Sequence, residues 1–121
     1  MKILACIGLL LVSTFSFAAE TLDAAAVKKL ITGKTADVLT ANTGEMRKTY
    51  FSADGKVVRQ ADDKTEEGTW TVEDDGSHCL QGVKGGCAMI VSNSDGTYDR
   101  VHKKKGNVLA RWLSFTDGKS F

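Results

Sequence analysis

The sequence predicts a mostly β protein, an antiparallel up-and-down meander that forms a small barrel or half-barrel, with one short N-terminal helix. Three observations indicate this fold. Turn-forming clusters that contain Gly recur from residue 42 to residue 118, and four of them include an Asp-Gly pair. The runs between the turns are rich in Val, Ile, Thr and aromatic residues, as is usual for strands. The short connections place neighbouring strands antiparallel, and closure into a barrel would hide the sheet edges.

The chain of 121 residues divides into a predicted signal peptide, residues 1–18, and a single domain, residues 19–121. Lys2 is followed by an apolar run over residues 3–12, which is too short to span a bilayer core of about 30 Å. The small residues Ser16 and Ala18 fit a cleavage site after Ala18. We therefore expect a protein that is exported to the periplasm or the extracellular space.

A single helix is expected over about residues 21–32. Either Thr21 or Asp23 can cap its N-terminus, because both side chains can accept a hydrogen bond from a free backbone N–H. Its apolar stripe is only three large residues wide, so we expect it to pack on the sheet rather than to lie on a membrane surface. The residues of this stripe are Val27, Leu30 and Ile31.

The strands are expected between the turn signals. Alternation places Trp70 and Val72 on one face, where Trp70 should be buried, and it places Trp112 and Phe115 on opposite faces of the last strand. Five of the seven residues from Ala61 to Glu67 are charged, so this segment is expected to be a mobile loop. The predicted strands are 36–40, 46–52, 56–61, 68–73, 77–81, 87–92, 97–103 and 107–115.

The charge balance and the cysteines exclude some classes of partner. Loss of the predicted signal removes Lys2 and Cys6 and leaves equal numbers of basic and acidic residues. No overall field then draws the protein to nucleic acid or to an anionic membrane. Cys79 and Cys87 remain, and in an oxidising compartment they are expected to form a disulfide.

No catalytic residue, metal site or cofactor is predicted. The histidines, His78 and His102, are not in a metal-binding spacing, and the Asp-Gly turns lack the acids of a calcium-binding loop. His78 next to Cys79 resembles a base beside a nucleophile. However, adjacent residues of a strand face apart, and a disulfide removes the thiolate. We therefore do not expect an enzyme.

The order and spacing of several short motifs resemble a family of small exported bacterial proteins classed as a domain of unknown function. The resemblance covers nearly all of residues 19–121 and implies export, a β-rich fold and a paired cysteine, but no established activity. The architecture is also similar to lipocalins and to lysozyme-inhibitor barrels, although the chain lacks the N-terminal Gly-x-Trp of the former and the Ser-Gly-x-x-Tyr of the latter. The motifs are LITGKT from Leu30, YFSADG from Tyr50, GTWTV from Gly68, Asp75-Gly76, Cys79, Cys87 and Tyr98.

Tyr98, Arg100 and His102 are the candidate ligand-binding residues. Period-two alternation puts them on one strand face, with Asp99 and Val101 on the other. If that face points into the barrel, the guanidinium and the imidazole could hold an anionic group beside the tyrosine ring. The alternative is that the face is exposed to solvent and that Val101 belongs to the core.

These observations predict a non-enzymatic, monomeric binding module of the cell envelope. Its partner would be a small ligand or an envelope protein, for example a secreted hydrolase that it inhibits, and neither nucleic acid binding nor a membrane span is expected. The alternative is a structural or interaction protein without a small ligand. Space left inside the barrel would favour the small-ligand binder, and a filled interior would favour the structural protein.

Overall fold

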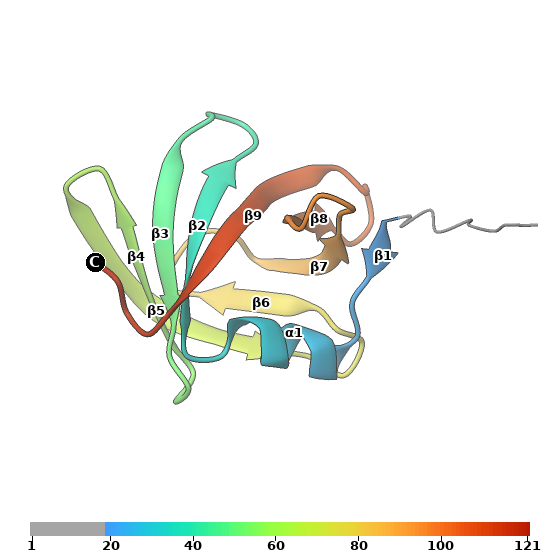
Figure 1. The fold of residues 1–121 in the computed structure, drawn as a ribbon, viewed down its shortest axis with the longest axis horizontal. Coiled ribbons are helices and arrows are strands. Elements are labelled where there is room, and N and C mark those ends of the chain that lie inside the picture. The colour runs from blue at the N-terminus through green and yellow to red at the C-terminus, as the bar shows by residue number, and fades with distance from the viewer. Residues whose placement is uncertain (1–18) are drawn as a thin grey trace, which may run out of the picture.

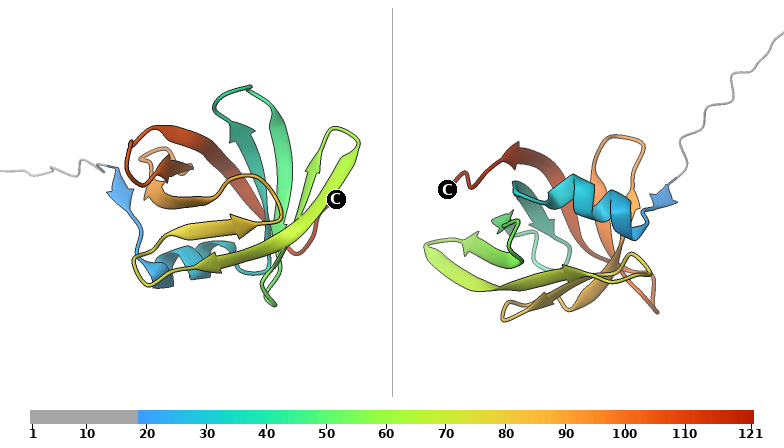
Figure 2. Two further views of the ribbon diagram at one scale, coloured as in Figure 1. Left: turned by 180° about the vertical axis from the view of Figure 1, so that it is seen from behind. Right: turned by 90° about the horizontal axis from the view of Figure 1, so that it is seen from below.

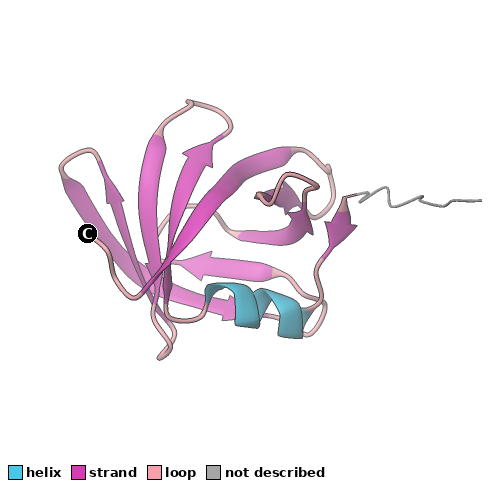
Figure 3. Ribbon diagram, viewed as in Figure 1, coloured by secondary structure: helices cyan, strands magenta, loops and turns pink. Residues whose placement is uncertain are grey.

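The computed structural model describes residues 19–121, which contain one helix and nine strands (Figure 1). Figure 3 distinguishes the helix from the strands. The predicted signal peptide, residues 1–18, lies outside the described residues. In chain order the elements are β1 (Glu20–Thr21), α1 (Ala24–Ile31), β2 (Lys34–Thr40), β3 (Met46–Phe51), β4 (Lys56–Ala61), β5 (Lys64–Val72), β6 (His78–Gln81), β7 (Cys87–Ser92), β8 (Tyr98–His102) and β9 (Val108–Asp117).

Strands β2 to β9 form a closed antiparallel barrel of eight strands, which confirms the predicted fold class. Each strand pairs with the next one along the chain, and β9 returns to pair with β2 over seven positions, from Lys34 to Thr40. The short β1 lies outside this circuit and pairs with β7, where Thr21 is opposite Val91. Closure leaves no strand of the barrel with a fully open edge, which protects a β protein against edge-to-edge association.

Helix α1 lies across one end of the barrel, as the right-hand view of Figure 2 shows. Asp23 is its N-cap, and the Asp23 carboxylate accepts a hydrogen bond of 2.8 Å from the backbone N–H of Ala26. The helix starts later than predicted because the backbone before Asp23 is extended, with Leu22 N–H donating to Ile90 O at 2.8 Å. Val27 and Ile31 are fully buried members of the barrel core, so α1 closes this end.

The segment from Ala61 to Glu67, predicted to be a mobile loop, is a β-hairpin. The pairing of β4 with β5 continues to Ala61 opposite Lys64. Asp62 forms the tight turn with a φ of 56°, a left-handed conformation that Asp tolerates better than most residues. The prediction of a loop was wrong because three of the five charged residues, Lys64, Glu66 and Glu67, lie in the solvent-exposed end of β5.

One register shift changes which side chains of β9 face inward. Asp37 is opposite Ser114 but Val38 is opposite Trp112, so β9 has one extra residue at this point. Such a bulge reverses the alternation of the strand beyond it. Trp112 and Phe115 therefore share the inner face, with ring centroids 5.9 Å apart, and their predicted placement on opposite faces was wrong.

The core is built from aromatic rings that pack with the buried side chains of α1. The Phe51 ring makes edge-to-face contacts with Trp70 at 5.9 Å and with Trp112 at 5.7 Å between centroids. Pairs of this geometry contribute about 0.5–1.5 kcal/mol beyond the burial of their area. Trp70 is 8% exposed, as predicted, and its indole N–H donates to Ser52 O at 2.9 Å.

The ladder between β6 and β7 is the shortest of the eight in the described barrel. It has two paired positions, His78 with Ala88 and Cys79 with Cys87. The second position carries the predicted disulfide, with Cα atoms 4.0 Å apart. The covalent bridge thus lies where the backbone pairing is weakest.

Candidate functional site

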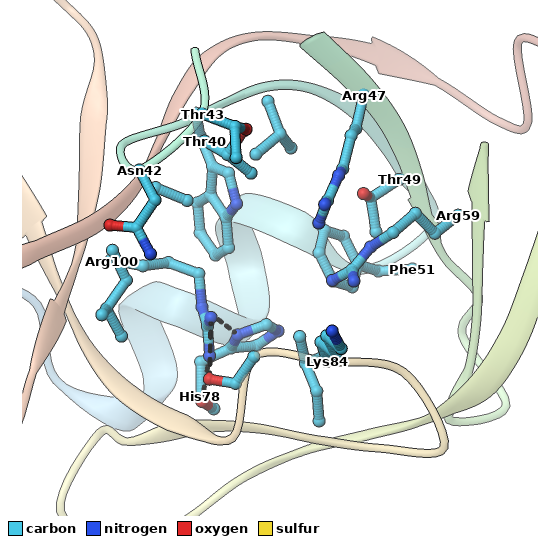
Figure 4. Close-up of a pocket in the computed structure, with 16 residues that line it drawn as sticks. Thr40, Asn42, Thr43, Arg47, Thr49, Phe51, Arg59, His78, Lys84 and Arg100 are labelled. Atoms are coloured by element: carbon cyan, nitrogen blue, oxygen red, sulfur yellow. Dashed lines mark hydrogen bonds between the residues drawn. The ribbon is translucent and has the colours of Figure 1, made fainter. Parts of the chain in front are cut away.

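A cavity of about 330 Å³ lies inside the barrel (Figure 4). Residues Asn42 and Thr43 of the β2–β3 hairpin and Lys84 and Gly85 of the β6–β7 hairpin form part of its wall. None of the lining residues comes from α1, so the cavity opens away from the helix. Its size lies at the lower end of the range of about 300–1,000 Å³ that small-molecule sites occupy. Its apolar wall consists of Val38, Phe51, Leu80, Leu109, Ala110 and Trp112.

The polar part of the cavity wall is basic. Arg47 on β3, Arg59 on β4, Arg100 on β8 and Lys84 in the β6–β7 loop line it. None of the sixteen lining residues, all within the described range, is acidic. Cations that converge in a partly enclosed space with low-dielectric walls create a positive potential there.

The guanidinium of Arg100 is buried and fixed by uncharged acceptors. The side chain is 4% exposed. Its Nε donates to His78 Nδ1 at 3.2 Å, and its terminal nitrogens donate to the carbonyl oxygens of His78 at 3.0 Å, Gly85 at 3.2 Å and Gly86 at 3.0 Å. Burial, followed by the charge of Arg59, lowers the pKa of Arg100 to about 10, so it stays protonated at neutral pH.

His78 is fully buried beside Arg100, in a neutral tautomer that the hydrogen bonds define. Because Arg100 can only donate, Nδ1 of His78 accepts and the ring proton is on Nε2. Nε2 has no hydrogen-bond partner in the described chain. Burial, then the charges of Arg100 and Arg59, hold the pKa of His78 well below its usual value.

Arg59 differs from Arg100 because no acceptor within residues 19–121 pairs with its guanidinium. It is 7% exposed, and its Nε is buried without a hydrogen-bond partner. No ion pair among the described residues includes Arg59. Burial, then the charge of Arg47, lowers its pKa, and the exposed Glu66 opposite it on β5 acts in the other direction. Figure 4 shows Arg47 and Arg59 pointing toward each other above Phe51.

Arg47 lies closer to the opening and is held by an acid at the rim. Its Nε at 3.1 Å and a terminal nitrogen at 2.9 Å both donate to the same carboxylate oxygen of Glu45. Both side chains of this ion pair are partly exposed, at 23% for Arg47 and 30% for Glu45. Exposed pairs of this kind contribute little, about 0–1 kcal/mol, so Arg47 can exchange its partner at low cost.

The structure does not bring the three predicted site residues together. Arg100 lines the cavity, whereas neither Tyr98 nor His102 is part of its wall. The Tyr98 ring packs on the core, with its centroid 5.9 Å from that of Phe115. The imidazole Nδ1 of His102 accepts hydrogen bonds from the N–H groups of Lys104 and Lys105 at the hairpin tip.

Sequence reasoning missed Arg47, Thr49 and Arg59, although a signal for them exists. In β3, alternation backwards from the core residue Phe51 leads to Thr49 and Arg47, and in β4 the core residue Val57 is followed two positions later by Arg59. Alternation from these core residues therefore indicates that Arg47, Thr49 and Arg59 also point into the barrel. A sequence pattern alone does not show that Thr49 and Arg59 lie directly opposite each other.

Residues 19–121 contain neither a free thiol beside His78 nor a cluster of potential metal ligands. Cys79 is bonded to Cys87 and carries no thiolate next to His78. No group of three or more potential metal ligands occurs among these residues. The single described helix is too short to cross a bilayer.

Comparison of the chain with protein-family models, with curated proteins and with solved structures finds no match. The resemblance to exported bacterial proteins therefore stays a prediction, and function has to be argued from the cavity.

Proposed function

We propose that this protein is a non-enzymatic binding module of the cell envelope that holds a small ligand inside its barrel. The observation that supports this best is the cavity of about 330 Å³. A chain of this length has enough large side chains to fill an eight-stranded barrel, yet this part of the interior is lined rather than filled. The fixed Arg100 and the rigid aromatic wall give such a ligand a preformed site.

Export is part of the proposal. A disulfide persists in oxidising compartments outside the cytoplasm, so the Cys79–Cys87 bridge supports the predicted signal peptide. The possible ligands are then molecules that reach the periplasm or the extracellular space.

The test is a thermal-shift screen of small metabolites on protein exported by cells that express the full chain. A ligand that binds only the folded state raises the melting temperature in a concentration-dependent way. Ala110→Phe places a ring in the cavity, whereas the matched variant Thr71→Phe adds the same ring on the exposed outer face of β5.

We expect ligands that stabilise the wild type and Thr71→Phe but not Ala110→Phe, with nuclear magnetic resonance spectra verifying that both variants are folded. If no compound shifts the wild type, the small-ligand proposal fails and the structural-protein alternative replaces it. Ligands that stabilise all three proteins equally would place binding outside the barrel.

A further inference from the structure

We infer that the ligand is a small organic acid, an oxyanion on an apolar body, and that Arg59, assisted by Thr49 and Arg47, binds its charged group. The inference rests on the proposed function and adds the chemical class of the ligand and the residue that recognises it. It also moves the anion site from Arg100, as the sequence suggested, to the opposite wall of the cavity.

The strongest evidence is the buried Nε of Arg59, which has no hydrogen-bond partner among the described residues. Arginine is almost never buried unless it is paired, because removing an unpaired charge from water is costly. Arg59 is 7% exposed, its Nε lacks a partner, and no acid of the described chain forms an ion pair with it. A bound oxyanion would supply the missing acceptors, and the planar fork of a guanidinium matches a carboxylate or a phosphate.

Neighbouring donors complete a site for an oxyanion. Thr49 is directly opposite Arg59 and 3% exposed, and no hydrogen bond of the described chain involves its hydroxyl. Arg47 projects into the same space, and its charge is the second cause of the lowered pKa of Arg59. An anion between the two guanidiniums would remove their mutual repulsion, and it would compete with Glu45 for Arg47.

Arg100 is not suited to this role because its donors are already used. Four hydrogen bonds direct its guanidinium toward His78, Gly85 and Gly86. Its charge adds to the positive potential of the cavity, but binding an anion directly would break contacts that hold the β6–β7 loop.

The apolar wall and the volume of the cavity indicate the polarity and the size of the rest of the ligand. Phe51, Leu80 and Trp112 offer apolar surface next to the arginines. A volume of about 330 Å³ corresponds to roughly ten water molecules at about 30 Å³ each. An inorganic anion would leave this surface unused, so we expect an organic acid of roughly ten to fifteen non-hydrogen atoms.

The experiment compares four probes of similar size by isothermal titration calorimetry on the exported protein. They are 4-phenylbutyrate, 3-phenylpropylphosphonate, the neutral 4-phenylbutanamide and the cationic 4-phenylbutylamine. We expect one or both acids to bind wild type at least tenfold more tightly than the amide and the amine. The ratio of the two acids then distinguishes a carboxylate site from a phosphate-type site.

Variants of Arg59 test whether this residue binds the charged group of the acid. Arg59→Gln should abolish the preference for the acid over the amide, and Arg59→Lys should recover only part of it because an ammonium lacks the fork. The control Lys104→Gln removes the same charge from the exposed β8–β9 turn and should bind like wild type. Within residues 19–121 the Arg59 side chain forms no hydrogen bond or ion pair, and only the exposed Glu66 on β5 offsets its charge. Arg59→Gln should therefore not lower the melting temperature, which separates a ligand-binding role from a structural one.

Three results would overturn the inference. The first is equal binding of acid and amide by wild type, which would leave the proposed cavity binder intact but remove its anion specificity. The second is acid binding by Arg59→Gln as tight as by wild type. The third is failure of all four probes to bind while the metabolite screen yields cavity ligands; failure of that screen as well would reject the proposed function itself.

Discussion

Arg100 is a buried cation whose acceptors are all uncharged. It joins the start of β6, through His78, to the loop before β7, through the carbonyls of Gly85 and Gly86. Dipoles that are fixed by the fold replace the water that the guanidinium loses. Arg100 therefore stabilises the wall of the cavity, and the sequence-based alternative of a solvent-exposed face does not apply to it.

Arg100→Ala should lower the free energy of unfolding by at least about 3 kcal/mol, because each buried acceptor left unsatisfied costs about 1–3 kcal/mol. Urea denaturation followed by tryptophan fluorescence measures this loss. Arg100→Lys should recover little of it, since one ammonium cannot reach all the acceptors. A loss below about 1 kcal/mol would mean that the four hydrogen bonds contribute almost nothing.

His78 should make stability depend on pH. Burial, then the charges of Arg100 and Arg59, hold its pKa in the folded protein well below 6.5. Between the two pKa values the unfolded chain binds the extra proton, so the free energy of unfolding falls as pH decreases, by up to about 1.4 kcal/mol per pH unit. Asp37, whose pKa is lowered from 3.8 by its hydrogen bond to Lys48, loses its contribution only at lower pH.

Urea titrations at intervals between about pH 7.5 and pH 5 test this prediction. The stability of the wild type should decline below about pH 6.5. His78→Asn retains an acceptor for Arg100 Nε without a titrating ring, so its curve should be flatter over the same interval. Parallel curves for the two proteins would show that His78 does not titrate as expected.

Among the elements, the β6–β7 hairpin depends most on covalent support. It has two paired positions, and its loop supplies the carbonyls of Gly85 and Gly86 to Arg100. The bridged cysteines are eight residues apart in sequence, for which the loss of chain entropy in the unfolded state gives about 2.5 kcal/mol. The disulfide and the hydrogen bonds of Arg100 thus both stabilise the β6–β7 hairpin.

The double variant Cys79→Ser/Cys87→Ser should fold but melt roughly 10 °C lower than the oxidised wild type. Differential scanning calorimetry measures the shift. A reducing agent should lower the wild type to nearly the same temperature and leave the variant unchanged. An unchanged melting temperature in the double variant would contradict a stabilising role for the bridge.

At the scale of the whole barrel, the ladders are of unequal length. β9 pairs with β2 at seven positions, whereas β6 and β7 share two. Opening of the native state starts where few backbone hydrogen bonds and few packed contacts have to break. Once the disulfide is reduced, so that no covalent bond crosses this seam, the barrel should therefore open first between β6 and β7.

Hydrogen–deuterium exchange with mass spectrometry tests this order of opening. Peptides that cover residues 80–88 should exchange sooner than peptides that cover β2 and the paired part of β9. Reduction of the disulfide should accelerate exchange in residues 80–88 more than elsewhere. Uniform protection across both seams would contradict the proposed weak point.

Local patterns in the sequence were sufficient for most of the fold. Turn residues and period-two runs predicted the strands of the barrel and the burial of Trp70. A cap residue and an apolar stripe predicted the helix, and the two cysteines that remain after the predicted signal predicted the disulfide. These patterns failed where pairing with a neighbouring strand determines the local structure. The bulge that turns Phe115 inward depends on the register with β2. The hairpin after Ala61 depends on the pairing of β4 with β5, which a run of charged residues does not indicate.

The candidate site was less predictable than the fold because it is assembled across strands. Arg100 was identified from its own strand, but its partner His78 is 22 residues away and meets it because β6 and β8 both pair with β7. Arg59 and Thr49 come into register across β3 and β4. Alternation says that a side chain points inward, but it does not say which inward side chains meet.

Because α1 closes one end, the cavity has its opening at the other, between the β2–β3 and β6–β7 hairpins. A molecule inside would have to leave by the route through which the next one enters. Replacement then cannot be concerted: the rate at which one occupant is exchanged for another should equal its own rate of departure, however concentrated the competitor. If the protein binds a ligand as proposed, the rate of release is then a property of the complex itself, determined by the opening between the two hairpins.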